Sequence, residues 1–134
     1  MVETFQLEIV TPDKLVVDDR AEEMQIPGKN GYLGVLPGHA PLITELAVGE
    51  ISYRRGGATQ RLSVAWGFAE VLPEKVTILA QTAERAEEVD AARAERARER
   101  ALARLQSGGS DTDYARAQAA LERALSRLEV AGKL

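Results

Sequence analysis

The sequence predicts an α+β fold, with an antiparallel β-sandwich or barrel in residues 1–84 and an antiparallel two-helix hairpin in residues 85–134. Apolar and polar residues alternate in the first part, and Gly and Pro interrupt the alternation at short intervals. From about residue 83 the composition changes to Ala, Arg, Glu and Leu, which are strong helix formers. Five of the six aromatic residues precede residue 85, so the core is expected in the first part.

The strands are expected where apolar residues recur with a period of two. This pattern covers residues 5–9 and 75–78, and it covers residues 62–68, where it assigns Trp66 and Phe68 to the core. Turns are expected at dipeptides whose residues favour positive or preset φ angles. These are Pro27-Gly28, Asn30-Gly31, Pro37-Gly38, Gly56-Gly57 and Pro73-Glu74.

Two helices are expected over residues 85–106 and 112–131, because residues 107–110 (SGGS) interrupt the helical composition and Asp111 can cap the second helix. The predicted apolar stripe is thin. Burying six large side chains at ~2 kcal/mol each gives about 12 kcal/mol, against an ordering cost of about 1 kcal/mol or more for each residue. The hairpin is therefore predicted to be marginal and able to open. The six side chains are those of Leu102, Leu105, Tyr114, Leu121, Leu125 and Leu128.

Composition excludes several kinds of site. The chain has no cysteine and one histidine, His39, so neither disulfides nor a His/Cys metal site is expected. The N-terminus shows no signal peptide, and no apolar run is long enough to span a bilayer. Residues 1–84 hold 12 acidic and 7 basic side chains, whereas residues 85–134 hold 9 acidic and 10 basic ones, nine of them arginines. The second part therefore has its own electrostatic character.

Arginines align on one face of each predicted helix, at about 100° per residue. No carboxylate stands three or four residues from Arg100 or Arg123, and like charges at that spacing destabilise a helix. The pattern favours an anion held between the helices, such as a triphosphate, or an acidic surface of another protein. A solvated face in loose contact with glutamates is the remaining interpretation. The aligned residues are Arg93, Arg100 and Arg104 on the first helix and Arg116, Arg123 and Arg127 on the second.

Several blocks resemble the epsilon subunit of bacterial F-type ATP synthases. They are residues 26–44 (IPGKNGYLGVLPGHAPLIT), 66–71 (WGFAEV), 76–80 (VTILA) and 89–94 (VDAARA), and the similarity covers essentially the whole chain. The resemblance implies a β-sandwich of about ten strands joined to two C-terminal helices. It also implies a peripheral, non-catalytic subunit of a complex on the cytoplasmic face of the bacterial plasma membrane.

The resemblance further implies the partners of the chain. The sandwich would bind the gamma subunit and rest on the c-ring of the rotor, with the loops around Tyr32 and His39 near those contacts. The extended hairpin would reach the catalytic alpha/beta head and block ATP hydrolysis. The folded hairpin would bind ATP as a regulatory ligand, with no cofactor required. The residues that the resemblance assigns to this nucleotide site are Glu84, Val89, Asp90, Arg93, Ala94, Arg100, Arg116, Arg123 and Arg127.

Residue types support sensing of ATP over its hydrolysis. Asp90 can accept a hydrogen bond from an exocyclic amine and arginines can clamp phosphates, although Asp90 also suits a first helical turn. Gly34 to Gly38 lacks the lysine of a phosphate-binding loop. The alternative within the same family is a hairpin that binds proteins only. A nucleic-acid binder is disfavoured, because the chain is acidic overall and its helices lack interleaved aromatic residues.

Overall fold

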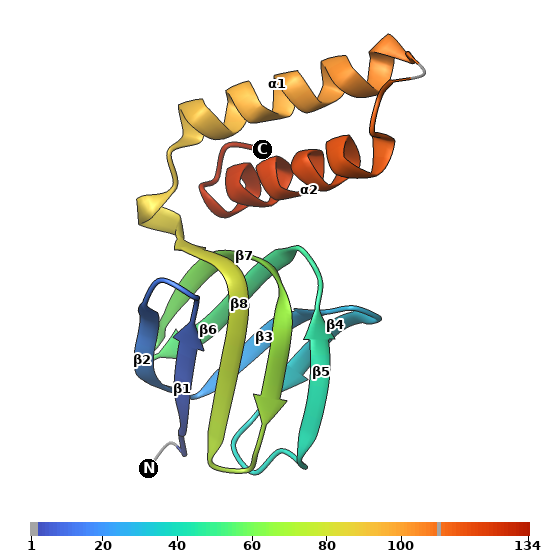
Figure 1. Cartoon of the computed structure of the whole chain (residues 1–134). Coiled ribbons are helices and arrows are strands. Elements are labelled where there is room, and N and C mark those ends of the chain that lie inside the picture. Colours follow the sequence, from blue (N-terminus) through green and yellow to red (C-terminus); the bar gives the residue numbers. More distant parts are fainter. Residues whose placement is uncertain (1–2, 110) are drawn as a thin grey trace.

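The computed structural model describes residues 3–109 and 111–134 and confirms the predicted fold. A β-sandwich forms one half of the molecule, and a helical hairpin lies across one end of it (Figure 1). Met1, Val2 and Ser110 lie outside the described residues, so the predictions for the first residues and for the last position of the interhelical break stay predictions. Among the described residues, none of the helices is both long and apolar enough to cross a membrane.

The sandwich has eight strands, where about ten were expected. The count is lower because β7 runs through both layers, pairing with β6 over its first half and with β5 over its second. The strands are β1 (Phe5–Val10), β2 (Leu15–Ala21), β3 (Glu23–Gly28), β4 (Gly31–Val35), β5 (Leu42–Leu46), β6 (Gly49–Arg55), β7 (Ala58–Val71) and β8 (Lys75–Arg85).

The strands form one hydrogen-bonded network in the order β2-β1-β8-β7-β5-β3-β4, with β6 paired to both β3 and β7. The pairings between these strands are antiparallel except that of β1 with β8, which is parallel. The expectation of a purely antiparallel sandwich is corrected in this one respect. In this parallel pair the start of β1 lies beside the start of β8, so the N-terminus and the end of β8, from which the helices continue, lie at opposite ends of the sandwich (Figure 1).

The core follows the predicted alternation in most strands. Phe5, Leu7 and Ile9 are at most 1% exposed, and Val76 and Ile78 are fully buried. Each of these side chains removes apolar surface from water and contributes roughly 1.5–3 kcal/mol on burial. Pro27-Gly28 does not form a turn, because both residues pair within the β3–β4 hairpin, whose turn is Lys29-Asn30.

The prediction that Trp66 and Phe68 belong to the core is wrong, because β7 changes phase in the middle. Trp66 has a φ of 51° and Gly67 a φ of 132°, so the two residues rotate the strand. Val64 and Ala65 are both buried before the rotation, and Phe68 is 52% exposed after it. This irregularity also sends the two halves of β7 to different partner strands, which lets one strand serve both layers.

The two helices begin later than expected. A 3-10 turn, η1 (Ala86–Glu88), links β8 to α1 (Ala91–Ser107), and α2 (Tyr114–Val130) comes after the interhelical break. Asp90 caps α1 by accepting a hydrogen bond from the Arg93 backbone N–H. Asp113, not Asp111, caps α2 in the same way, and Gly108 ends α1 in the left-handed conformation.

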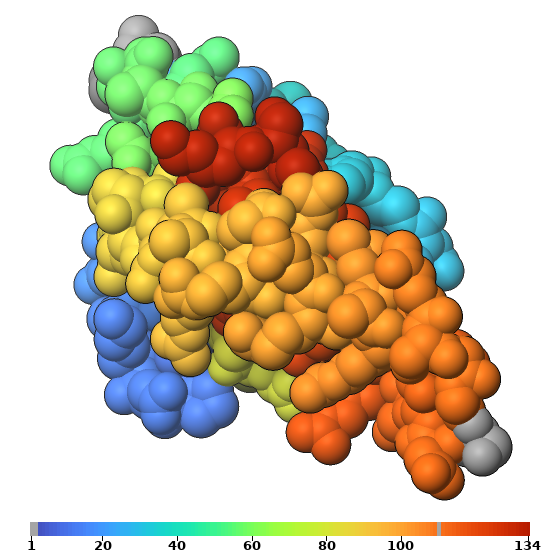
Figure 2. Space-filling model, turned by 90° about the horizontal axis from the view of Figure 1, so that it is seen from above, coloured from blue at the N-terminus to red at the C-terminus, as the bar shows by residue number. Residues whose placement is uncertain are grey.

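Small side chains line the hairpin. The two buried residues of α1 are Ala94 and Ala101, and α2 adds Ala117 and Ala124; we call these four residues the alanine seam. Of the six large apolar side chains expected to be buried, only that of Leu128 is buried, and Tyr114 is 48% exposed. The helix α2 lies between α1 and the sandwich in Figure 1, and α1 forms the outer layer in Figure 2.

Candidate functional site

A cleft of about 230 Å³ opens where the end of β8 meets the two helices. It draws residues from the strand, from the N-terminal turns of α1 and from the last turns of α2. Six of the nine predicted nucleotide-binding residues line it, together with Ala97. The six are Glu84, Asp90, Arg93, Ala94, Arg100 and Arg127.

An ion pair closes one side of the cleft. The Nε of Arg127 on α2 donates to Oε1 of Glu84 on β8 at 2.6 Å. The two side chains are about one third exposed, at 29% and 35%, so solvent screens the pair only in part. This contact ties the C-terminal helix directly to the sandwich, over 43 residues of chain.

Asp90 has two roles available at the same position. Its Oδ1 accepts from the Arg93 backbone N–H at 3.1 Å, which satisfies one of the free donors at the start of α1. The side chain also lines the cleft. Among the described residues its Oδ2 makes no further hydrogen bond, so this oxygen can accept one from a ligand.

The remaining three predicted residues do not line the cleft. The guanidinium of Arg123 lies over the Trp66 ring, 5.3 Å from its centroid, so this arginine docks α2 on β7. Arg116 borders a separate depression near the tip of the hairpin, with Arg104, Asp111 and Asp113. Val89 precedes α1 as the end of the linker. The arginines that align on each helix therefore have different neighbours.

The charge of the cleft suits an anion with several negative charges. Three guanidinium groups face two carboxylates, and one of the three, Arg127, is already paired. Arg93 and Arg100 lie about two helical turns apart on α1 and are both exposed, so they can reach a phosphate from solvent. The volume is below the ~300–1,000 Å³ of most sites for drug-sized ligands, so a nucleotide would fill the cleft and extend beyond it.

The two predicted partner residues lie on the sandwich. Tyr32 is in β4 and is 62% exposed, while its hydroxyl accepts from the Glu50 backbone N–H at 3.0 Å. His39 lies in the loop between β4 and β5, where its Nδ1 is 2.6 Å from the Ala40 carbonyl. Both side chains are therefore available to a partner at least in part.

An apolar strip on the outer face of the sandwich was missed from the sequence. We define it by Ile43 on β5, Phe68 on β7 and Leu79 on β8, all of which are more than half exposed. Phe68 pairs directly with Leu79, and Ile43 pairs with Glu70, two residues along the same face of β7. Gly67 was the available signal, because a glycine inside a strand often marks a bulge that changes the phase.

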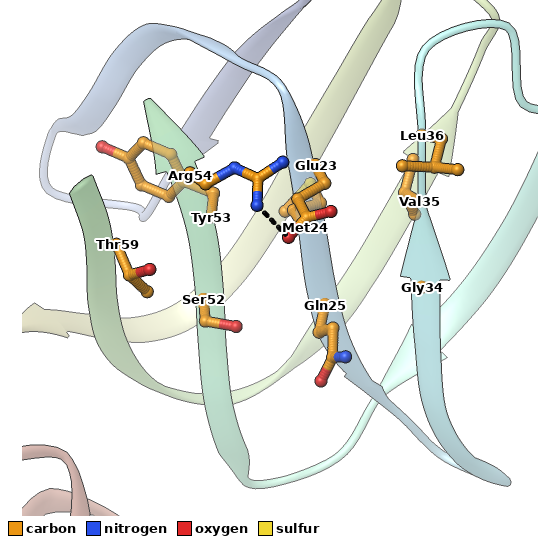
Figure 3. A pocket seen from close by; sticks show the side chains of 10 residues that line it. All are labelled: Glu23, Met24, Gln25, Gly34, Val35, Leu36, Ser52, Tyr53, Arg54 and Thr59. Carbon is orange, nitrogen blue, oxygen red and sulfur yellow. Dashed lines mark ion pairs between the residues drawn. The ribbon is translucent and has the colours of Figure 1, made fainter. Parts of the chain in front are cut away.

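A second concave surface lies over β3, between β4 and β6, with a volume of about 400 Å³ (Figure 3). Its charges neutralise one another, since Arg54 pairs with Glu23 at 3.3 Å. Burial raises the pKa of Tyr53 above its usual value of 10, and the nearby Asp19 carboxylate raises it further. Tyr53 donates to Asp19 at 3.2 Å. None of the predicted site residues lines this surface.

No cluster of three or more His, Cys, Asp or Glu side chains suited to a metal ion occurs within residues 3–109 and 111–134. The charged groups that line the cleft are the guanidinium groups of three arginines and the carboxylates of Glu84 and Asp90. Such groups bind and orient a charged ligand.

Comparison with known proteins agrees with this architecture. Residues 4–86 match the ATP synthase delta/epsilon chain beta-sandwich domain, and residues 87–132 match the long alpha-helix domain of the same chain. The chain is 69% identical to the ATP synthase epsilon chain of Koribacter versatilis (strain Ellin345) over 111 residues, which cover 83% of this chain and 78% of that one.

Two further relatives extend the comparison. The ATP synthase epsilon chain of Desulfosudis oleivorans (strain DSM 6200 / JCM 39069 / Hxd3) is 50% identical over 109 residues, with 81% of this chain and 82% of that one covered. A chain in the cryo-EM structure of the Euglena gracilis mitochondrial ATP synthase (OSCP, F1 and c-ring) superposes with a TM-score of 0.82. Its sequence identity is 27%, and the match covers 96% of this chain and 81% of that chain. The chain therefore belongs to the ATP synthase delta/epsilon chain family, as a non-catalytic epsilon subunit.

Proposed function

We propose that the chain is a regulatory subunit of the central stalk that joins gamma to the c-ring and restrains ATP hydrolysis through its hairpin. In this role the sandwich stays on the rotor, at the cytoplasmic face of the bacterial plasma membrane. The hairpin alternates between the docked form and an extended form that enters the catalytic alpha/beta head. ATP bound in the cleft stabilises the docked form.

One observation carries the proposal for ATP. Residues from three separate elements, β8, α1 and α2, converge on one cleft only when the hairpin is docked. A ligand that bridges Arg93, Arg100 and Arg127 binds the docked form and not the extended one, so it shifts the equilibrium toward docking. With micromolar affinity, ATP at a concentration about 1,000-fold above Kd would stabilise the docked form by about 4 kcal/mol, which is a useful amount for a marginal hairpin.

The apolar strip supports the proposed contact with gamma. Ile43, Phe68 and Leu79 form a contiguous exposed surface on three neighbouring strands, and such surfaces mark protein interfaces. It lies on the sandwich and involves neither helix, so the hairpin can leave without disturbing it. Tyr32 and His39 are proposed to lie near the contacts with the rotor.

We expect ATP to bind the full-length chain, and the arginines of the cleft to be required. Replacing Arg100 with alanine removes a charge-assisted contact worth roughly 1.5–3 kcal/mol, which is a loss of about 10- to 100-fold in affinity. Isothermal titration calorimetry with the wild type, Arg100→Ala and Arg116→Ala measures this. Arg116 is the matched control, because it is exposed on the hairpin but borders a different depression.

The same titration distinguishes two functions of the hairpin, which are ATP sensing and protein interaction alone. If the intact chain takes up no ATP at concentrations up to the millimolar range, the cleft is not a nucleotide site. The hairpin then acts only as a protein-interaction element, whose arginines meet acidic groups of the catalytic head. One observation favours this second function. Glu84 already neutralises Arg127, so this arginine of the cleft needs no ligand.

Docking of the hairpin is expected to be visible in the fluorescence of Trp66, the single tryptophan of the chain. Release removes Arg123 from the indole and admits water, so emission should move to longer wavelength. Arg123→Ala removes a contact worth about 0.5–2 kcal/mol and should shift the docking equilibrium roughly 2- to 30-fold toward release. Emission spectra with and without ATP measure the shift.

Arg116→Ala serves again as the control for this experiment, since Arg116 lies away from the indole. An Arg123→Ala spectrum that is identical to the wild-type spectrum, both with and without ATP, would contradict a docking role for Arg123.

A further inference from the structure

A buried hydroxyl pair marks the place where α2 meets the sandwich. The Oγ atoms of Ser126 on α2 and Ser63 on β7 are 2.8 Å apart, and both residues are only 7% exposed. Ser126 Oγ also lies 3.1 Å from the Gly49 carbonyl. A carbonyl only accepts, so Ser126 donates to Gly49 and Ser63 donates to Ser126. This hydrogen bond therefore fixes the position of α2 relative to the start of β6.

Gly49 is also enclosed from the opposite side. A Cβ atom at this position would lie 2.7 Å from Cβ of Pro27 and 2.8 Å from the hydroxyl of Tyr32. The same hydroxyl accepts from the backbone N–H of Glu50 at 3.0 Å. Tyr32 therefore packs over the Gly49–Glu50 backbone and fixes the peptide group whose carbonyl receives Ser126.

The two contacts share one peptide group. The Gly49 carbonyl and the Glu50 N–H belong to the same planar unit, so a rotation of this unit moves both groups together and changes both hydrogen bonds. One end of this unit holds the exposed Tyr32 ring, and the other end holds the hairpin. A peptide plane cannot tilt at one end alone, so the two contacts are coupled by geometry.

We propose that Tyr32, the Gly49–Glu50 peptide and Ser126 form a mechanical link through which a protein that engages the Tyr32 phenol weakens the docking of the hairpin. The partner would be a protein surface with its own hydrogen-bonding group for the phenol. By thermodynamic reciprocity, a docked hairpin weakens that contact by the same factor. The inference rests on the hairpin opening as in the proposed function, but it does not require ATP.

The first test measures the link from α2 to the start of β6, by NMR amide hydrogen exchange in the full-length chain. Ser126→Ala removes the donor to the Gly49 carbonyl, and exchange of the Glu50 amide should accelerate about threefold to tenfold. Ser107→Ala is the matched control, because Ser107 is on the hairpin and bonds only to the Arg104 carbonyl among the described residues. Ser63→Ala, on the sandwich, removes the hydroxyl that positions Ser126 and should also accelerate exchange of the Glu50 amide.

The second test runs in the opposite direction. Tyr32→Phe keeps the ring and removes the hydroxyl that accepts from Glu50, so Trp66 emission should move toward that of the released hairpin. Tyr114→Phe is the control, because the Tyr114 hydroxyl makes no hydrogen bond among the described residues. Unchanged exchange at Glu50 in both serine variants, or unchanged Trp66 emission in Tyr32→Phe, overturns the link. Neither result depends on nucleotide, so failure of ATP binding and failure of the link are distinguishable.

Discussion

Arg127→Ala is expected to abolish most of the ATP affinity of the chain, by about 10- to 100-fold or more. The substitution removes a guanidinium that lines the cleft and leaves Glu84 without its partner. The released carboxylate then faces the phosphates and repels them, which adds to the loss. Isothermal titration calorimetry on the full-length variant measures the change, with Arg116→Ala as the reference for a hairpin arginine outside the cleft.

A double substitution makes this expectation sharper. Glu84→Ala in the Arg127→Ala background removes the unpaired carboxylate, so part of the lost affinity should return. Arg127→Lys keeps the positive charge but loses the planar fork, and it should fall between the wild type and Arg127→Ala. Equal affinities in the wild type and Arg127→Ala would show that the cleft does not bind phosphate through this residue.

Gly67→Ala is expected to destabilise the sandwich by about 3 kcal/mol or more. At a φ of 132° an L-residue is strained, and an added Cβ would collide with the Leu79 carbonyl of the paired strand β8. For a domain of this size such a loss lowers Tm by more than about 10 °C. Thermal unfolding followed by the near-ultraviolet circular dichroism of the aromatic side chains measures it, because five of the six aromatic residues lie in the sandwich.

Gly34→Ala provides the matched control for this substitution. Gly34 also lies in a strand, but an added Cβ meets nothing within 4 Å and its φ is not positive. A small change in Tm is expected there, within the range of ordinary surface substitutions, ±0.5 kcal/mol or so. Similar Tm values for the two variants would mean that β7 can relax around Gly67 without loss of stability.

The division into sandwich and hairpin was predictable because the two parts differ in periodicity and composition. The alternation over residues 5–9 specifies a buried face, and the structure buries that face. The phase change at Trp66 was not predictable in the same way. Its φ of 51° is unusual for a residue with a side chain, and β7 pairs with β8 on both sides of it, a long-range contact that the local sequence does not specify.

The candidate site was predictable to the extent that it depends on one helix at a time. Helical spacing places Arg93 and Arg100 on a common face of α1, and both reach the cleft. The same spacing groups Arg123 with Arg127, yet Arg123 lies over Trp66. The helical period predicts which side of the helix a residue lies on, but it does not predict which other element packs against that side. The contact of Ser63 with Ser126 spans 63 residues and left no periodic signal.

The alanine seam sets how opening of the hairpin responds to temperature. The change in heat capacity on exposing apolar surface is about 0.45 cal/K/mol for each Å², so it scales with the size of the side chains that become wet. Ala94, Ala101, Ala117 and Ala124 each carry little apolar surface, so these four residues add only slightly to the heat-capacity change when they become exposed. The contribution of the alanine seam to the opening free energy therefore curves little with temperature, and the larger share of any curvature comes from the buried and half-buried leucines of the two helices.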